Sequence, residues 1–438
     1  MRQISLTDGS IAKKLILFSI PMILGNLLQQ VYNIADTLIV GRFLGADALA
    51  AVGSSYTLMV FITSVIIGLC MGSGAFFSED YGAGNEKLLA EDVRLSFLFI
   101  GSVTAAIILL IYPGMDLIVS MLKTPEHLIE TTKDYVRVVF AGIVFVFLYN
   151  FFAYLLRSTG DSVSSLIFLA ISSVMNIFLD IIFIVVFELG VEGAAAATVI
   201  SQVFSAVGIM IYAQRKLGDI KDAKVSLRGA RLKEIVCGDI ATGIQQSVMN
   251  FGILMIQGLV NSFGASIMAS FAAAVKIDTL AYMPAQEFSN GYSLFVSQNK
   301  GACESQRIKE GSRYAFLIST LFCLFVSVMI FIFAPDLMSV FVGSSELQII
   351  KDGAVYLRIE GAMYVGIGIL FLWYGYFRGI GKPRISLILT VISLGTRVAL
   401  SYAFSKSTSL GVIIIWLSIP IGWILADIAG YIFYRKVN

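Results

Sequence analysis

Charged side chains are scarce in this sequence. Asp, Glu, Lys and Arg make up only 14% of its 438 residues, while hydrophobic residues make up 58%. A soluble chain typically carries about 25% charged residues to cover its surface. Stretches almost free of charge recur instead, at 16–40, 95–111, 140–156 and 316–333. Because a helix needs roughly 20 apolar residues to cross a bilayer, and the alternating pattern of a transmembrane barrel is missing, we predict an all-α, polytopic membrane protein.

Residues that bind metals or act as general bases are also few. The only histidine is His127, and the four cysteines (Cys70, Cys237, Cys303 and Cys323) show no paired spacing. This argues against a disulfide framework, a zinc or haem site and catalysis by a histidine base. The net charge of +2 gives no indication of a nucleic-acid partner. We expect neither an enzyme nor a cofactor.

Twelve transmembrane helices are predicted, and several are longer than a bilayer requires, so they tilt or extend beyond it. Their expected ranges are 14–42, 50–80, 91–113, 127–155, 161–187, 191–216, 232–262, 266–298, 311–334, 348–377, 383–405 and 409–435. The first is too long for a signal-peptide core and has no small-residue cleavage pattern, so residues 1–14 are expected to be a retained tail. Most of the 31 Lys and Arg residues lie on the side of the two termini. Since basic loops remain in the cytoplasm, we expect an inner-membrane protein with both termini cytoplasmic.

The sequence contains an internal duplication. FLGADALAAV in the first half matches SFGASIMASF in the second, which aligns Gly45 with Gly264. At a slightly larger shift, LLRSTGD matches YFRGIGK and aligns Gly160 with Gly381. Each repeat holds six helices, so both enter from the same side and are related by an axis along the membrane normal. The predicted parts are an N-terminal lobe (1–217), a basic cytoplasmic linker (218–233) and a C-terminal lobe (234–438).

Two lobes with a cleft between them suit transport by alternating access, although duplicated bundles also form channels and scaffolds. Polar residues inside the predicted spans favour transport, because an ionisable group in a membrane helix is costly unless it faces protein or water. Asp36 is the only charge between Lys14 and Arg42. Gln29 and Asn33 share its helical face, and Pro21 predicts a bend in the same helix. Asp36 therefore either serves function or hydrogen-bonds a neighbouring helix.

The fifth and sixth predicted helices carry similar stripes. Asn176 and Asp180 lie one turn apart, and Asp180 is the sole charge of its span. Thr198 and Gln202 lie one turn apart on the next helix. Carboxylate, amide and hydroxyl oxygens are ligands that hard cations prefer. Two buried carboxylates can also hold a proton, since two charges close together away from water repel each other. Sodium and proton both remain open.

The second half carries a different set. Gln246 and Asn250 belong to a neutral polar stripe on the seventh helix, completed by Gln257 and Asn261. Glu287, on the eighth helix, is a candidate for a substrate contact or for packing. Arg397 is either its counter-ion or a residue whose charged end reaches the membrane surface.

Two other charged pairs in the second half are interpreted as structural. Lys276 and Asp278 either neutralise each other or lie near the membrane surface, and Glu360 and Arg358 are interpreted as a pair at a helix end.

Several motifs resemble those of the MATE (multidrug and toxic compound extrusion) family of transporters. They occur in order over essentially the whole chain: IPMILGNLLQQVYNIADTLIVGRFLGADALAAVG near the start, YGAGN at Tyr81–Asn85, LLRSTGD at Leu155–Asp161 and YFRGIGKPR in the second half. Within the family the chain is most similar to the prokaryotic DinF-like branch. The resemblance implies two six-helix lobes in a V-shaped bundle around a central cavity.

The same resemblance implies a cation or proton site in the N-terminal lobe, formed by Asp36, Asn176, Asp180 and Thr198. It also implies export of organic compounds in exchange for protons or sodium. One position departs from the NorM-like branch, which has a seventh-helix glutamate where this sequence has Met249, so a second cation site of that kind is not expected.

We therefore predict a secondary active antiporter that exports organic, cationic or amphipathic compounds. Its expected partners are a small organic substrate and membrane lipid, and it is expected to be a monomer with no metal other than a sodium ion at the cation site. The alternative is a flippase for lipid-linked saccharides or lipids, which would be expected to carry cationic cavity residues and often extra helices.

Overall fold

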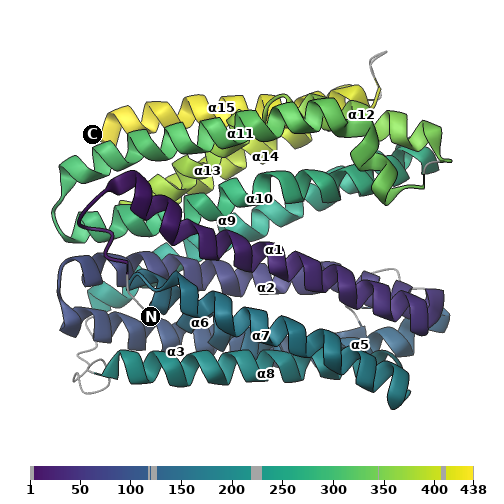
Figure 1. The fold of residues 1–438 in the computed structure, drawn as a ribbon, viewed down its shortest axis with the longest axis horizontal. Coiled ribbons are helices and arrows are strands. Elements are labelled where there is room, and N and C mark those ends of the chain that lie inside the picture. Colours follow the sequence, from purple (N-terminus) through teal and green to yellow (C-terminus); the bar gives the residue numbers. More distant parts are fainter. Residues whose placement is uncertain are drawn as a thin grey trace. The chain divides into compact units, whose positions relative to one another are not determined.

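The fold is described by a computed structural model, in which residues 4–116, 119, 126–218, 229–343, 345–405 and 411–437 are described. All regular secondary structure in these residues is helical, as Figure 1 shows. The chain divides into two compact units. Unit 1 comprises residues 1–5 and 20–243, and unit 2 comprises residues 6–19 and 244–438. Most of the predicted linker, 218–233, lies outside the described residues.

The helices of the first half run from α1 to α8, and their bounds are α1 (Ile11–Phe43), α2 (Gly45–Gly82), α3 (Glu86–Ile111), the 3₁₀ turn η1 (Glu126–Leu128), α5 (Ile129–Ala141), α6 (Ile143–Ser158), α7 (Ser162–Asp180), the π-helix η2 (Ile181–Val186) and α8 (Gly190–Lys216). The remaining elements are α9 (Gly229–Val260), the 3₁₀ turn η4 (Asn261–Phe263), α10 (Ala265–Gly301), α11 (Ser305–Phe341), α12 (Leu347–Gly361), α13 (Tyr364–Gly379), α14 (Pro383–Phe404) and α15 (Ile413–Val437). The unit boundaries fall inside α1 and α9.

The helices are long and apolar enough for a multi-pass membrane protein. Among the described residues, ten helices meet this test, or eleven when the bent pair α12 and α13 counts as one span. Helix α9 is long enough, at 32 residues, but it is not among them, and the amides of Gln246, Asn250, Gln257 and Asn261 interrupt its apolar sequence. Each of the twelve predicted spans coincides with a helix or with two consecutive helices. The predicted fold class is confirmed.

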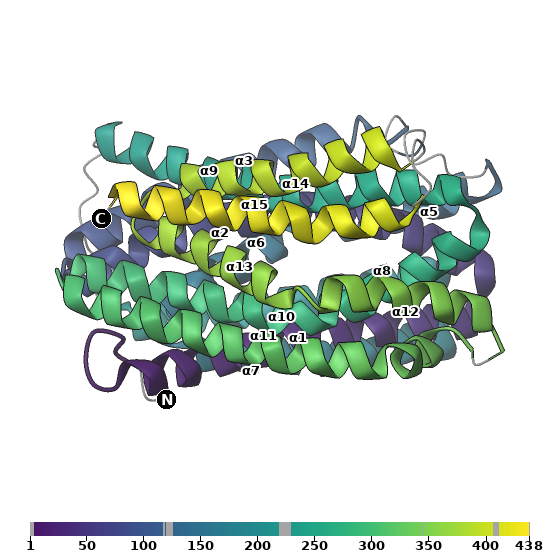
Figure 2. The ribbon, with the colours of Figure 1, turned by 90° about the horizontal axis from the view of Figure 1, so that it is seen from above.

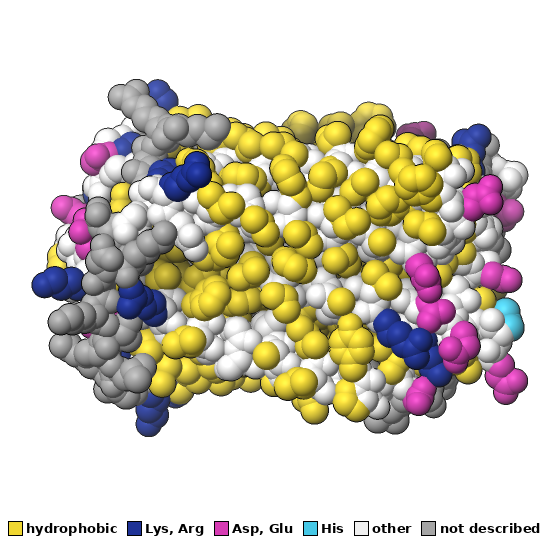
Figure 3. Space-filling view, turned by 90° about the horizontal axis from the view of Figure 1, so that it is seen from below, with side chains coloured by type: hydrophobic (Ala, Val, Ile, Leu, Met, Phe, Trp, Pro, Cys, Tyr) yellow, Lys and Arg dark blue, Asp and Glu magenta, His cyan; other side chains and the backbone are white. Residues whose placement is uncertain are grey.

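Large apolar side chains cover the outside of the helices. Leu109 is 72% exposed, Leu110 74%, Val174 68% and Phe325 64%. Figure 3 shows one face on which hydrophobic side chains cover the middle stretch and charged side chains gather towards the helix ends. A water-soluble protein rarely exposes a continuous apolar surface of this kind, so these side chains are suited to contact lipid.

The backbone repeats the duplication that the sequence indicates. Left-handed φ angles occur at Gly45 and Gly264, and again at Gly84 and Cys303, two pairs with the same separation along the chain. Two further pairs, Gly160 with Gly381 and Gly190 with Gly411, also have left-handed φ angles, and their separation along the chain is slightly larger. Because such a φ angle is rare outside glycine, four matched pairs show that both repeats use the same turns between helices.

Two predicted spans are interrupted at equivalent places, which the sequence analysis missed. The fourth span breaks at Gly142 into α5 and α6, and the tenth breaks at Ala362 and Met363 into α12 and α13. The axes of α12 and α13 differ by 52°, and Figure 2 shows the change of direction. Neither break contains proline, so no sequence signal marked them. A Cβ atom on Gly142 would lie 2.8 Å from Val199, so the missing side chain lets α8 pack closely at this break.

Two of the sequence motifs, YGAGN and LLRSTGD, contain residues that cap helices. The Asn85 side chain in YGAGN accepts a hydrogen bond from the Leu88 backbone N–H at 3.1 Å, which caps α3. Asp161 in LLRSTGD caps α7 by accepting from the Ser164 backbone N–H at 3.0 Å. Next to it, Gly160 has φ +88°, and a Cβ there would lie 2.3 Å from the Ile4 carbonyl oxygen. These motifs therefore fix the beginnings of α3 and α7, and α7 is the helix that carries Asn176 and Asp180.

Aromatic side chains form much of the packing inside each unit. In unit 1, Phe97 packs against Phe147 and Phe151, with ring centroids 5.3 Å apart in both pairs. In unit 2, the ring of Phe271 stacks on Trp416 at 5.2 Å, and Tyr356 packs edge-on against both. This second cluster fixes the Tyr356 side chain, which lines a cavity described below.

Candidate cation site and polar cavity

The two predicted carboxylates of unit 1 lie together. Asp36 of α1 and Asp180 of α7 have carboxyl groups within hydrogen-bonding range of each other. Asp180 is fully buried. Two carboxyl groups can hydrogen-bond only when one of them carries a proton, so this arrangement requires a proton or a cation between two groups that otherwise repel.

Asn176 and Thr198 form the second pair of the predicted site. The Asn176 Nδ2 atom donates to Thr198 Oγ1 at 3.4 Å, which joins α7 to α8. Asn176 is 2% exposed. Its amide N–H is used by Thr198, and its Oδ1 oxygen is left buried without a donor.

The oxygens of this site lack donors. Within the described part of the chain, no N–H or O–H donates to either carboxylate oxygen of Asp180, to Oδ1 of Asp36 or to Oδ1 of Asn176. Buried polar atoms are nearly always hydrogen-bonded, so four such oxygens on two helices point to a ligand that supplies positive charge. A proton suits the carboxyl pair, and a sodium ion suits the oxygen-only donor set.

A change in helical geometry follows the site directly. The α-helix α7 ends at Asp180, and a π-helix occupies Ile181–Val186. Phe187 N–H donates to the Ile182 carbonyl, five residues back, at 2.9 Å. Single π-turns are rare and occur often at functional sites. The apolar sequence IIFIVV gave no indication of this feature.

The other polar residues predicted in unit 1 lie apart from these contacts. Gln29 is exposed and hydrogen-bonds Tyr32, while the Asn33 carbonyl accepts from Thr37 Oγ1 at 2.8 Å. Gln202 Oε1 would lie 2.9 Å from a Cβ on Gly142 and has no donor in the described structure. Helix α1 continues through Pro21, and the predicted bend there stays a prediction.

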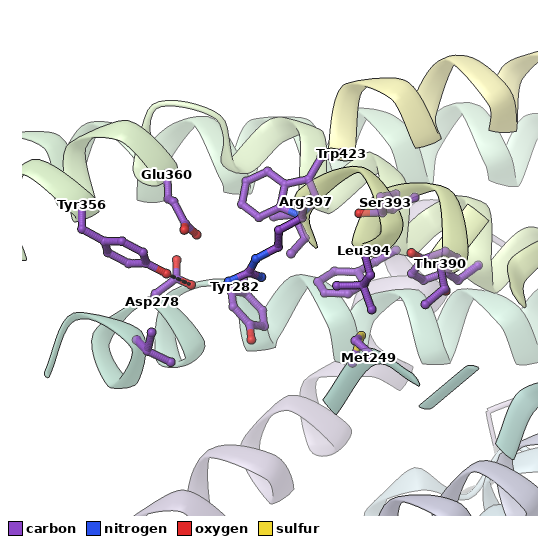
Figure 4. Close-up of a pocket in the computed structure, with 15 residues that line it drawn as sticks. Met249, Asp278, Tyr282, Tyr356, Glu360, Thr390, Ser393, Leu394, Arg397 and Trp423 are labelled. Carbon is purple, nitrogen blue, oxygen red and sulfur yellow. Dashed lines mark hydrogen bonds between the residues drawn. The ribbon is translucent and has the colours of Figure 1, made fainter. Parts of the chain in front are cut away.

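Unit 2 contains a cavity that is lined on one side by Asp278 of α10, Glu360 of α12 and Arg397 of α14. Figure 4 shows the three charged side chains turned towards one another, with Tyr282 and Tyr356 beside them. The remaining lining residues are Met249, Val275, Ile367, Leu370, Phe371, Tyr374, Thr390, Ser393, Leu394 and Trp423.

Two tyrosines hold Asp278 in place. Tyr364 Oη donates to Asp278 Oδ1 at 2.7 Å, and Tyr356 Oη lies 3.4 Å from Oδ2. Glu360 is 1% exposed, with Asp278 and Tyr356 as its polar neighbours, yet neither of its carboxylate oxygens has a hydrogen-bond partner of normal geometry among the described residues. The charge of Arg397 acts on both carboxyl groups, yet its Nε atom is buried without an acceptor.

These contacts correct two interpretations of the sequence. Asp278 is hydrogen-bonded by tyrosines rather than paired with Lys276. Arg358 donates to the Phe331 carbonyl at 3.3 Å and does not pair with Glu360. The charge of Arg397 acts on Asp278 and Glu360. The sequence could indicate that these charges lie inside spans, but separate helices bring them together, and no local spacing records that.

Gln246 and Met249 line a second, smaller cavity with Asn290 and Arg378. The Asn250 amide donates to the Gln246 carbonyl at 3.3 Å, and Glu287 accepts from Asn290 Nδ2 at 3.2 Å. Neither Asn250 nor Glu287 is among the lining residues of this cavity. No group of three or more His, Cys, Asp or Glu side chains arranged for a metal occurs in the described ranges.

Duplicated bundles of membrane-spanning helices with buried polar clusters inside each unit are typical of multi-pass membrane transporters. The chain belongs to the MatE family, whose sequence profile matches residues 21–182 and 241–403, one match in each half. The predicted family is thereby confirmed.

Relatives extend along the whole chain. A probable multidrug resistance protein, YpnP, of Bacillus subtilis is 31% identical over 99% of this chain and 97% of its own length. The probable multidrug resistance protein NorM of Thermotoga maritima is 27% identical over 93% of this chain and 88% of its own. A solved outward-facing structure of a multidrug resistance MATE family transporter is 27% identical, with a TM-score of 0.91 covering 100% of this chain and 98% of that one.

Proposed function

We propose that this protein is a secondary active antiporter that exports organic, cationic or amphipathic compounds in exchange for protons, with sodium as the alternative coupling ion. The observation that carries the proposal is the carboxyl pair of Asp36 and Asp180, whose buried oxygens receive no hydrogen bond from the residues that the structure describes. The full-length relatives named as multidrug resistance proteins support the substrate class. A flippase is not favoured, because the polar cluster of unit 1 is acidic.

The exchange follows from competition between two charge states. When Asp36 and Asp180 share a proton, their mutual repulsion is removed and the conformation that holds them together is stabilised. Loss of the proton disfavours that conformation. Antiport requires only that the ion and the substrate prefer different conformations, or that both compete for the same carboxyl groups. Asn176 and Thr198 complete the site by joining α7 to α8 beside Asp180.

The membrane, orientation and assembly complete the proposal. The excess of Lys and Arg on the side of the termini supports an orientation with both termini in the cytoplasm, and we propose that the protein lies in the cell inner membrane. Each unit has its own buried polar cluster, so a single chain carries all the groups the exchange requires, and we propose a monomer.

The test is transport by the purified protein in liposomes, with a proton gradient and a sodium gradient imposed separately. We expect dye transport to follow the proton gradient. Asp36→Asn and Asp180→Asn should reduce transport to the level of empty liposomes, because neither variant can take up and release the shared proton. Asp134→Asn removes a carboxylate from a surface ion pair with Arg137 and should leave transport unchanged.

Two other results would change the proposal. Transport driven by a sodium gradient alone would show that the site binds sodium. Full gradient-driven transport by a correctly inserted Asp36→Asn variant would remove Asp36 from the mechanism.

A further inference from the structure

The cavity of unit 2 lacks partners on both of its charged sides. On one side, the Glu360 carboxylate is buried beside Asp278 and Tyr356, and neither oxygen has a hydrogen-bond partner of normal geometry within the described residues. On the other side, the buried Nε of Arg397 has no acceptor in the part of the chain that the structure describes. Asp278 differs, since Tyr364 and Tyr356 already hydrogen-bond it. The two groups that need a partner are therefore Glu360 and Arg397, and they are of opposite charge.

Glu360 and Arg397 do not satisfy each other. The guanidinium and the carboxyl groups interact across the cavity, but in the described structure no ion pair or hydrogen bond joins Arg397 to Glu360 or Asp278. Figure 4 shows the Arg397 side chain extending from α14 towards the two carboxyl groups, with cavity space beside it. A buried charge without a close partner destabilises a protein by several times the free energy that a surface ion pair contributes. The arrangement suits a ligand that brings both a donor and an acceptor.

The remaining walls suit a flat apolar body. Trp423, Phe371, Tyr374 and Tyr282 line the cavity with rings, and the polar groups converge near Glu360 and Arg397. Drug-sized ligand sites have this composition, with mainly apolar walls and a few polar groups that fix orientation. Aromatic ligands stack favourably on such rings.

We propose that this cavity binds zwitterionic aromatic compounds, with the ligand's ammonium group at Glu360 and its carboxylate at Arg397. This proposal rests on the proposed export function, and it names the class of substrate that the protein would export. The site is separate from the carboxyl pair of unit 1, so binding here and ion coupling there can be measured independently.

Three indole compounds test the charge requirement on the unmodified protein. L-tryptophan carries both charges, tryptamine only the ammonium and indole-3-propionate only the carboxylate. Binding of tritiated tryptophan to the full chain in lipid nanodiscs, with the other two as competitors, gives all three affinities. We expect tryptophan to bind at least about tenfold more tightly than either analogue, because each lost charged hydrogen bond is worth about 1.5–3 kcal/mol.

Two variants identify which residue recognises which charge. Glu360→Gln should remove the preference for tryptophan over indole-3-propionate and keep the preference over tryptamine. Arg397→Gln should do the reverse. Asp427→Asn changes a partly buried carboxyl of unit 2 that is not a lining residue and should preserve both preferences. Thermal unfolding of each variant confirms that it is folded.

The failures of the two proposals are distinguishable. Equal affinity for the three compounds, or no binding of any at millimolar concentration, would overturn the zwitterion site whatever the variants do. Asp36→Asn should lose gradient-driven transport and still bind tryptophan normally. If it loses transport while tryptophan never binds, the export proposal stands and the cavity assignment fails.

Discussion

Buried carboxylates in this protein differ in what they contact, and the contact decides what each can do. Asp92 is fully buried, and its two oxygens accept hydrogen bonds from Arg231 Nε at 3.1 and 3.0 Å. One oxygen of Asp239 accepts from Ser73 Oγ at 2.6 Å, while its other oxygen lacks a partner in the described structure. Asp180 and Glu360 each have another carboxyl group beside them, and both oxygens of each lack hydrogen-bond partners of normal geometry within the described ranges. Neither burial nor one oxygen without a donor therefore marks a functional residue, whereas two neighbouring carboxyl groups that both lack donors do.

The Arg231 network provides a stability prediction at this scale. Arg231 bridges Asp80 and Asp92, whose side chains are 4% and 0% exposed. Arg231→Gln should destabilise unit 1 by about 3–5 kcal/mol, because two buried carboxylates lose their counter-charge. Thermal unfolding in detergent measures the effect. Arg137→Gln breaks an exposed pair with Asp134 and should change stability by no more than about 1 kcal/mol. Equal effects of the two would show that the network contributes no more than a surface pair.

At the scale of the helix, the ends are specified more sharply in the sequence than the middles. Asn85 and Asp161 cap α3 and α7, and glycines with left-handed φ angles end the preceding segments. The breaks at Gly142 and Ala362 and the π-helix after Asp180 lie inside apolar runs. Local residue preferences act strongly at helix ends, but inside a span the neighbouring helices determine where the geometry changes.

The α7 cap has a predictable pH dependence. Burial of Asp161 works against its charged form, but hydrogen bonds from Lys216 and Ser164 outweigh burial and lower the pKa of this carboxyl from its usual value. A lowered pKa in the folded state means that the stabilisation is present above the unfolded pKa of about 3.9 and is lost as the pH falls through the folded value. Asp161→Asn keeps a capping oxygen but loses the charge contact with Lys216.

Unfolding temperatures at pH 7 and at successively lower pH measure this effect. Asp161→Asn should be less stable than the unmodified protein at pH 7, by about 1–3 kcal/mol, and the gap should close in acid. Asp116→Asn, which removes an exposed partner of Lys133, is the matched control and should change little. A gap that stays constant down to low pH would mean that the charge of Asp161 does not contribute.

At the scale of the whole molecule, the sequence alone predicts on which side of the membrane each turn lies. Cys303 is exposed, at the turn between α10 and α11, and the charge bias predicts that it lies in the cytoplasm. With Cys70, Cys237 and Cys323 replaced by alanine, a membrane-impermeant maleimide should label Cys303 in inverted vesicles and not in intact cells. A cysteine introduced at the exposed Glu188 should show the opposite pattern. Labelling of both positions from the same side would overturn the predicted orientation.

The sequence by itself determined the class of fold, the approximate limits of the helices, the duplication and the polar stripes that carry Asp36 and Asp180. Hydropathy and residue spacing act along one helix, and motifs preserve the turns, so all of these can be read from consecutive residues. The pairing of Asp278 and Glu360, the place of Arg397, the helix breaks and the π-helix were decided only by tertiary structure. Those features depend on which residues of separate helices meet, and in a membrane helix a charge that faces a cavity and one that faces a partner have the same local sequence.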